Sequence, residues 1–305
     1  MKNIILLFAL FVFGGCNSSP DKNVADEDLE EILIDPEVFE EYLDLSEILN
    51  DSIEIVPLET TEKCLISEIT QIELYKDKIY MSDNGNAKVF VYTTTGHFLY
   101  SIGRQGTGPG EYSYLGNFTF KEDSILIQDL YRNKYIVYDL YGNSYREIPY
   151  NVYHNEIVSF DNIGYLISNY GESSYGNFNL FKFDFHTSNV IYPELPFDEK
   201  QTDKSRYRLR RYSSKYDDAA TLIYPLNDTI YTLKKDIVHP SYVIHFTSRN
   251  LPENLDVDRD MLFQFVRKNR YLKGFEYLQN SQNYLLGYYI DAVSYTHLRA
   301  HETRH

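Results

Sequence analysis

Short runs in which apolar and polar residues alternate cover most of the chain beyond residue 70, and turn residues separate them. Such alternation predicts short strands, and the turns predict that successive strands run antiparallel. One unit repeats without a gap, because Lys76–Asp83 and Lys88–Tyr92 match Glu122–Asp129 and Lys134–Tyr138 at a single offset of 46 residues. A period of this length that holds about four strands is typical of a β-propeller blade.

Weaker copies of the same unit follow. They cover Asn162–Asp184, Asn227–Phe246 and, as the start of a fifth copy, Phe275–Ile290. Between the last two copies, residues 252–273 show helical spacing of apolar residues. The sequence therefore predicts an all-β fold, a β-propeller with four blades between about residues 70 and 247 and the start of a fifth.

Composition agrees with sheets and narrows the choice of partners. Of 305 residues 30 are Tyr and 18 are Phe, and both types favour strands. The formal net charge is −16, which repels phosphate backbones, so we expect no nucleic-acid partner. The two cysteines, Cys16 and Cys64, are too few for a disulfide framework or a structural zinc cluster.

The N-terminal residues have the pattern of a signal peptide. Lys2 is followed by the apolar run Ile4–Phe13 and then by Gly14, Gly15 and Cys16, and this run is too short to span a bilayer. Small residues directly before a cysteine resemble the lipobox of bacterial lipoproteins. This resemblance implies a signal peptide over residues 1–16 and a lipid on Cys16, which would be the only attachment to a membrane; the alternative is an ordinary secretory signal cut nearby. The polar, acidic stretch 17–49 is predicted to be a tether.

The C-terminal residues change abruptly in composition. Residues 294–305 contain His297, His301 and His305, which at helical spacing would imitate a metal site. We reject that interpretation because the string resembles the translation of a sequencing adapter. We expect a non-native tail, a chain truncated near Val293, a partial β-propeller over residues 50–293, and a β-type run, Asn283–Ile290, that has no strand to pair with.

Several of these motifs together resemble a known family. The strands Ile79–Asp83 and Lys88–Tyr92, followed by the loop Gly103–Tyr112, look like an NHL-type repeat. The opening Ile55–Glu59 and the later Pro240–Phe246 are similar to segments of the six-bladed β-propeller lipoproteins of Gram-negative bacteria. The resemblance implies a six-bladed propeller, incomplete here, in the cell envelope and lipid-anchored at the outer membrane, facing the periplasm or the cell exterior.

The glycine-rich loop is the first candidate site. Gly103–Gly110 has no Gly-Lys-Ser/Thr ending and opens no helix, so it fits neither a P-loop nor a dinucleotide fingerprint. The loop is better explained as a connection between blades that needs positive φ at several glycines. Its polar residues Arg104 and Gln105 are retained as candidate ligand-binding residues.

A basic cluster is the second candidate site. In an extended chain, Lys204, Arg206, Arg208 and Arg210 would share one face and Arg211 would lie on the other. That face could bind the carboxylates or sulfates of an acidic glycan, because Arg pairs with planar anions through two hydrogen bonds. The alternative is a solvated segment whose charges balance nearby acids.

No sequence pattern indicates catalysis. There is no nucleophile elbow or Ser-His-Asp order, and we expect no catalytic residue, no metal and no cofactor. We expect a ligand-binding or interaction module for a glycan or peptide, including an anionic one, with its ligand at one face of the central channel. The alternative function is that of a propeller hydrolase or lyase that uses channel carboxylates and a divalent metal.

Overall fold

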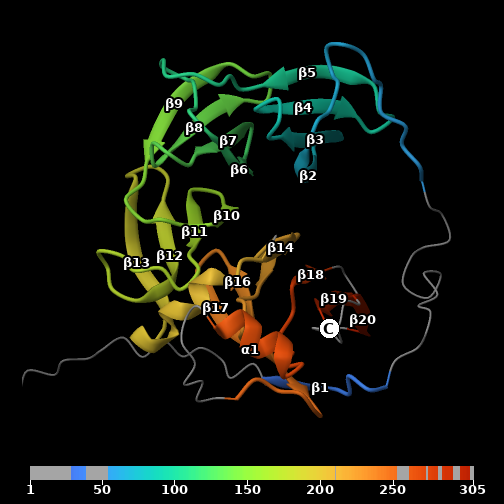
Figure 1. The fold of residues 1–305 in the computed structure, drawn as a ribbon. Helices are drawn as coiled ribbons and strands as arrows, with labels where there is room; N and C mark the ends of the chain where they lie inside the picture. Colours follow the sequence, from blue (N-terminus) through green and yellow to red (C-terminus); the bar gives the residue numbers. More distant parts are fainter. Residues whose placement is uncertain are drawn as a thin grey trace, which may run out of the picture.

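The computed structural model describes residues 29–38, 54–209, 211–252, 261–272, 274–280, 284–290 and 296–302. Their strands form five sheets that follow one another around a common centre (Figure 1). Within each sheet the strands pair antiparallel and in sequence order, apart from one added strand in the fourth sheet. This is a β-propeller arrangement of four blades followed by a three-stranded fifth sheet, which confirms the predicted all-β fold.

The strands of each blade come from one continuous stretch of chain. The first blade contains β2 (Ile69–Tyr75), β3 (Lys78–Asp83), β4 (Lys88–Thr93) and β5 (Phe98–Ile102). The second contains β6 (Leu115–Lys121), β7 (Ser124–Asp129), β8 (Lys134–Asp139) and β9 (Ser144–Pro149). The third contains β10 (Glu156–Phe160), β11 (Ile163–Ile167), β12 (Phe178–Asp184) and β13 (Asn189–Pro196). The fourth contains β14 (Ser213–Tyr216), β15 (Ala219–Leu222), β16 (Thr229–Lys234) and β17 (Ile237–Phe246). The fifth contains β18 (Tyr277–Asn280), β19 (Tyr284–Ile290) and β20 (Thr296–Glu302).

The hydrophobic core lies between neighbouring blades. Tyr80, Val91 and Ile102 of the first blade pack in one cluster with Phe118 and Ile127 of the second. Because middle strands are covered on both faces, they are apolar at successive positions and not only at alternate ones. Burial of both faces therefore joins the blades into one body.

The 46-residue repeat of the sequence is a repeat of structural contacts. At the end of β3 the Asp83 carboxylate accepts the N–H of Ser67 at 2.6 Å, and at the end of β7 the Asp129 carboxylate accepts the N–H of Ser113 at 3.0 Å. The hydroxyl groups of Tyr92 and Tyr138, which also correspond to each other, both donate to a backbone carbonyl that precedes their own blade. The repeated polar residues thus hold each blade to the segment that enters it.

Two elements differ from the sequence prediction. Glu30–Ile34 forms β1 and pairs in parallel with β17, so this part of the predicted tether 17–49 is a fifth strand of the fourth blade. Ile34 of this added strand is buried at the edge of that blade. Glu199–Arg206 forms the 3-10 helix η2 and not an extended segment. Asp198 caps this helix, since its carboxylate accepts the N–H of Lys200 while the side chain of Gln201 bonds back to the N–H of Asp198.

The last described elements both confirm and correct expectations. Helix α1 (Leu262–Lys268) lies in the stretch predicted to be helical. The prediction that Asn283–Ile290 has no strand to pair with is wrong, because β19 pairs with β18 on one side and with β20 on the other. Backbone pairing at a sheet edge needs no particular side chains, so it does not test the origin of residues 294–305. Their assignment as a non-native tail stays a prediction.

Candidate functional site

The first strands of the five blades lie nearest the centre of the propeller (Figure 1). In three of them, one polar side chain bonds the backbone in, or directly before, the first strand of the next blade. Gln71 of β2 bonds both the N–H and the C=O of Phe118, Asn117 of β6 donates to the C=O of Asn155, and Glu156 of β10 accepts the N–H of Tyr212. Ordinary polar residues thus link adjacent blades around the axis of the propeller.

Arg211 makes a different kind of contact, because its partner does not lie in the blade that is next along the chain. It lies just before β14 of the fourth blade, and its guanidinium donates to Glu73 Oε1 of the first blade at 2.5 Å. The second and third blades lie between these two along the chain, so the ion pair joins blades that are not neighbours in sequence order. The side chains of Arg211 and Glu73 are 32% and 28% exposed, which leaves both groups accessible to solvent.

Glu156 completes this cluster. Its carboxylate also accepts a hydrogen bond from the hydroxyl of Ser213 in β14. Burial raises the pKa of Glu156, and the charge of Arg211 and the hydrogen bonds from Ser213 and Tyr212 offset only part of this effect. Burial works against the charge of Arg211, but the carboxylates of Glu73 and Glu156 outweigh it and raise the pKa of the guanidinium. We call Glu73, Glu156, Arg211 and Ser213 the axial site.

The axial site can both donate and accept hydrogen bonds. A guanidinium has five N–H donors, and among the described residues one of them has a hydrogen-bond partner. Two carboxyl groups and one hydroxyl lie beside it. Such a site suits a ligand that presents hydroxyl, amide or carboxylate groups together, and it suits an isolated anion poorly because the two carboxyl groups oppose it.

The described residues of the predicted basic cluster, Lys204 and Arg208, do not share one extended face. Lys204 lies in η2, where its ammonium donates to the carbonyl of Leu226 at 3.0 Å and lies over the ring of Tyr170. Burial lowers the pKa of Lys204. Arg208 follows the helix and is exposed, the side chain of Arg206 is not among those described, and Arg210 lies outside the described residues. The prediction of a shared extended face is wrong because the segment begins as a helix.

The glycine-rich loop connects β5 to β6, as its sequence predicted. Gly103 and Gly110 have positive φ, and the loop surrounds a carboxylate of its own chain. Glu111 accepts the N–H of Gly108 at 2.9 Å and pairs with Arg104 at 2.7 Å, and a Cβ at Gly106 would lie 2.0 Å from its carboxylate. An internal anion therefore occupies the position that a bound phosphate would need. Gln105 is exposed and its amide donates to the carbonyl of Ser113 at 3.3 Å.

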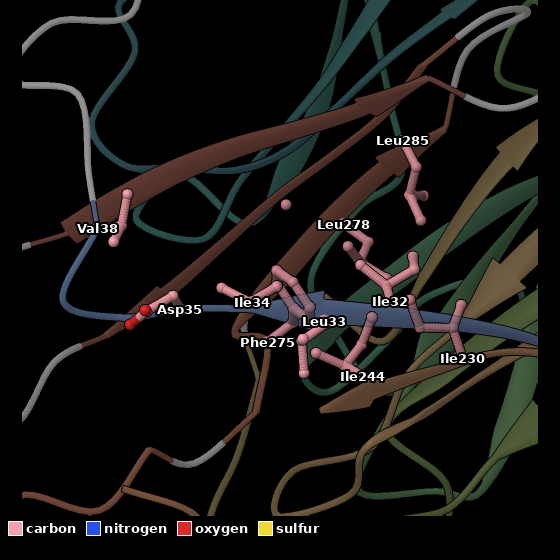
Figure 2. A pocket seen from close by; sticks show the side chains of 11 residues that line it. Ile32, Leu33, Ile34, Asp35, Val38, Ile230, Ile244, Phe275, Leu278 and Leu285 are labelled. Atoms are coloured by element: carbon pink, nitrogen blue, oxygen red, sulfur yellow. The ribbon is translucent and has the colours of Figure 1, made fainter. Parts of the chain in front are cut away.

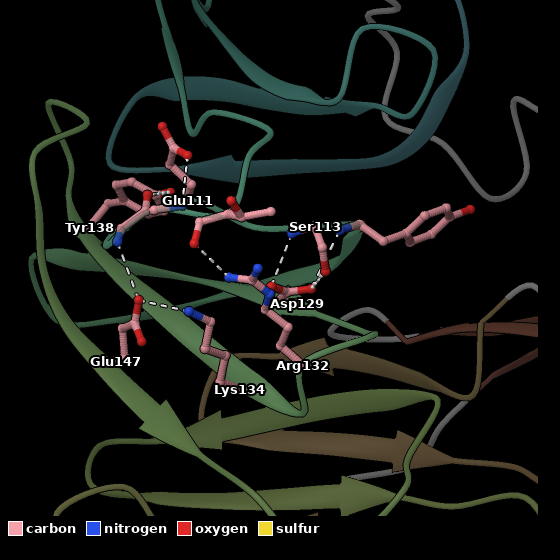
Figure 3. A network of polar contacts seen from close by, with 11 residues as sticks. Glu111, Ser113, Asp129, Arg132, Lys134, Tyr138 and Glu147 are labelled. Atoms are coloured by element: carbon pink, nitrogen blue, oxygen red, sulfur yellow. Dashed lines mark hydrogen bonds and ion pairs between the residues drawn. The ribbon is translucent and has the colours of Figure 1, made fainter.

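Polar contacts fasten this loop to the second blade (Figure 3). Arg132 donates to the carbonyl of Thr107 at 3.0 Å. Glu147 accepts the N–H of Gly110 at 3.2 Å and pairs with Lys134 at 2.7 Å. Lys134 holds the pKa of the Glu147 carboxyl below its usual value. These charged groups bond to other groups of the same chain, so they stabilise the connection between the first and second blades.

A cavity of about 240 Å³ lies between β1, the fourth blade and the fifth (Figure 2). Ile34 of β1, Ile230 of β16, Ile244 of β17 and Leu278 of β18 contribute apolar walls, and Asp35 is its one charged lining residue. Most of the lining residues are apolar and none of them belongs to the axial site, so this cavity is distinct from that site.

Three of the described histidines lie in different blades or at their borders. His97 and His245 are exposed beside Glu59 and Glu31, and His154 is buried. Within the described ranges, no group of three or more His, Cys, Asp or Glu side chains is placed to hold a metal ion. Among these same residues no helix is both long enough and apolar enough to cross a membrane.

Sequence reasoning missed the axial site. Arg211 was assigned to the face opposite the four predicted ligand-binding cations, and Glu73 and Glu156 were not singled out. The available signal was weak: each residue lies in or just before the first strand of a repeat unit. Nothing in the sequence shows that the first and fourth of these strands bring their side chains together.

Comparison with known proteins agrees with the fold. The profile of a family described as Domain of unknown function (DUF4934) matches residues 31–304. A protein of Bacteroides fragilis NCTC 9343 described as exported shares 17% identity and a TM-score of 0.72, over 90% of this chain and 80% of that one. A DUF4221 family member of Bacteroides vulgatus shares 11% identity and a TM-score of 0.50, over 77% and 74% of the two chains. No curated protein matches the sequence significantly.

Proposed function

The chain belongs to this DUF4934 family, and from its own side chains we propose that it is an exported, lipid-anchored propeller that binds a glycan or a peptide at the axial site. The proposed location in the cell rests on two observations. The first 16 residues have the pattern of a lipoprotein signal ending at Cys16, which lies outside the described residues. The structurally similar protein of Bacteroides fragilis is described as exported. A lipid-anchored protein of the cell envelope, like the NHL-like lipoproteins that the sequence resembles, agrees with both observations.

The contact between Arg211 and Glu73 carries the proposal for the site. Three blades supply Arg211, Glu73 and Glu156, so the cluster exists only in the folded propeller. Donors and acceptors lie side by side and remain partly exposed. Sugars and peptides carry both kinds of group, and a rigid set of side chains can recognise them without reorganisation.

A hydrolase or lyase is the second candidate, and one observation favours it. The raised pKa of Glu156, which shares the Arg211 guanidinium with the carboxyl group of Glu73, is what a general acid in such a site needs. Turnover of a bound ligand would assign this activity to the same residues. Retention of the ligand without turnover would favour a binding module.

The test compares Arg211→Gln with Arg208→Gln. Both changes remove one guanidinium, but Arg208 is exposed and lies outside the axial site. The probes are soluble polygalacturonate, arabinoxylan and glucomannan in affinity electrophoresis, and peptides of trypsin-digested casein in a pull-down with mass spectrometry. We expect Arg211→Gln to weaken binding about 10- to 100-fold, since charge-assisted hydrogen bonds contribute about 1.5–3 kcal/mol. Arg208→Gln should bind as wild type does.

A double variant guards against misfolding. Glu73→Gln with Arg211→Gln removes both charges of the ion pair and leaves no unpaired partner at Glu73. Its melting temperature should stay close to that of the wild type while binding is lost. If the double variant binds normally and Arg208→Gln does not, the ligand lies on the exposed basic segment. If no probe of either class binds, the proposal fails.

A further inference from the structure

We infer that Tyr114 and Tyr131 form a stacking platform for a pyranose ring at the same end of the propeller as Arg211. This inference rests on the proposed function and narrows its ligand to a glycan. The two rings have centroids 5.0 Å apart and planes inclined by 42°. Tyr114 is 40% exposed and Tyr131 is 75% exposed. A large part of both aromatic surfaces therefore faces solvent.

The backbone beneath this pair is firmly held. Tyr114 directly precedes β6, and its N–H donates to the buried carboxylate of Asp129 at 3.4 Å. The N–H of Leu130, the residue before Tyr131, donates to the carbonyl of Tyr114 at 3.4 Å. Asp129 also accepts two hydrogen bonds from Ser113. The rings are thus presented from an ordered joint, which reduces the entropy lost when a ligand binds.

The platform lies at the same end of the propeller as Arg211. The first strands of successive blades run in one direction along the axis, as in propellers generally. Tyr114 precedes β6 by one residue and Arg211 precedes β14 by two, so both lie where their strands begin. Since β7 is antiparallel to β6, the turn that carries Tyr131 returns to this end.

Polar groups flank the two rings. The amide of Gln105 donates to the carbonyl of Ser113, directly before Tyr114. The guanidinium of Arg132, directly after Tyr131, donates to the carbonyl of Thr107 in the glycine-rich loop. Arg104, from the same loop, has an 81% exposed side chain. An aromatic surface bordered by amide and guanidinium groups matches a sugar ring, which has apolar C–H faces and hydroxyl groups at its edges.

A second tyrosine pair shows what a structural pair looks like in this chain. Tyr100 and Tyr141 have centroids 6.5 Å apart and planes inclined by 41°. The Tyr100 hydroxyl donates to the carbonyl of Leu140, and the ammonium of Lys78 lies over the ring of Tyr141. By contrast, among the described residues neither Tyr114 nor Tyr131 has a hydrogen-bond partner for its hydroxyl. Tyr114 and Tyr131 therefore offer a ligand their exposed ring surface and their hydroxyl groups.

The test uses Tyr131→Ala and its matched control, Tyr141→Ala. Tyr141 is 76% exposed and lies in the β8–β9 turn, at the opposite end of the same blade. The probes are soluble polygalacturonate, arabinoxylan and glucomannan in affinity electrophoresis. We expect Tyr131→Ala to weaken retention by the bound polysaccharide about tenfold, as an aromatic contact of about 1 kcal/mol or slightly more would. Tyr141→Ala should be retained as strongly as the wild type.

Each outcome bears on one proposal separately. Loss of retention with Tyr131→Ala but not with Arg211→Gln supports the platform and refutes the axial site. Loss with Arg211→Gln but not with Tyr131→Ala or the double change Tyr114→Ala with Tyr131→Ala overturns the platform and keeps the axial site. If none of the polysaccharides binds while casein peptides do, the inferred glycan is wrong and the proposed binding function stands.

Discussion

His154 should make the stability of this propeller depend on pH in a defined window. Its ring is 1% exposed, and its Nδ1–H donates to the carbonyl of Val152 at 2.8 Å. Its Nε2 therefore accepts hydrogen bonds, from the amide of Gln128 at 3.0 Å and from the hydroxyl of Tyr135. Protonation at Nε2 would replace this acceptor with a donor and place a charge in the core.

The magnitude follows from the two states of the imidazole. Burial lowers the pKa of His154 from 6.5 to about 4, against the opposing effect of the Val152 carbonyl. The unfolded chain takes up a proton near pH 6.5, and the native protein does so only near pH 4. The free energy of unfolding therefore falls as the pH is lowered through this window, by about 3 kcal/mol in total and by at most about 1.4 kcal/mol per pH unit.

The assay is urea unfolding of the wild type and of His154→Gln at intervals between pH 7 and pH 4.5. Glutamine cannot titrate, and its amide can still accept a hydrogen bond from Gln128. We expect the variant to be less stable at pH 7 by about 1–3 kcal/mol, because a buried hydrogen-bonded group is lost. The difference between the two proteins should shrink steadily towards pH 4.5.

A constant stability difference across this range would refute the reasoning. Nuclear magnetic resonance of the His154 ring gives an independent check, since its proton shifts should show no titration above pH 5.

Asp83, Asp139 and Asp184 have a lowered pKa because their hydrogen bonds outweigh burial, so their contribution to stability is lost at still lower pH. They affect wild type and variant equally and cancel in the comparison.

Two further predictions concern the ends of the chain. Cys16→Ser should move the protein from the membrane fraction to the soluble fraction and abolish labelling by an alkyne-tagged fatty acid. The lipid anchor would be contradicted if the variant still sediments with membranes and the wild type carries no acyl group by mass spectrometry. Deletion of residues 294–305 should leave the melting temperature unchanged if this tail is non-native; a marked fall would show that the pairing of β20 with β19 contributes to stability.

Local signals determined most of the fold. The 46-residue repeat, the alternating runs and the turn residues predicted the blades, because strand formation and tight turns depend on neighbours within a few residues. The glycine-rich loop was also correctly predicted to be a connection, since its composition matches neither a P-loop nor a dinucleotide site. The same local information predicted the helix at Leu262–Lys268.

Local signals failed where a segment could adopt two structures. In an extended chain the cations around Lys204 would share one face, but the capping contacts between Asp198 and Gln201 start a 3-10 helix instead. Glu30–Ile34 reads as an acidic tether, and only the free edge of β17, far along the chain, makes it a strand. Both outcomes depend on contacts that composition does not specify.

The tertiary structure alone decided the axial site and the tyrosine platform. Arg211 and Glu73 are 138 residues apart, and their contact exists because the blades curve around one axis. Tyr114 and Tyr131 come together because Asp129 and the β7–β8 turn bring them to the same joint. Strand periodicity shows which residues share a face, but not the angle at which one sheet meets the next. That angle comes from packing between blades, and it determines which side chains can reach a common ligand.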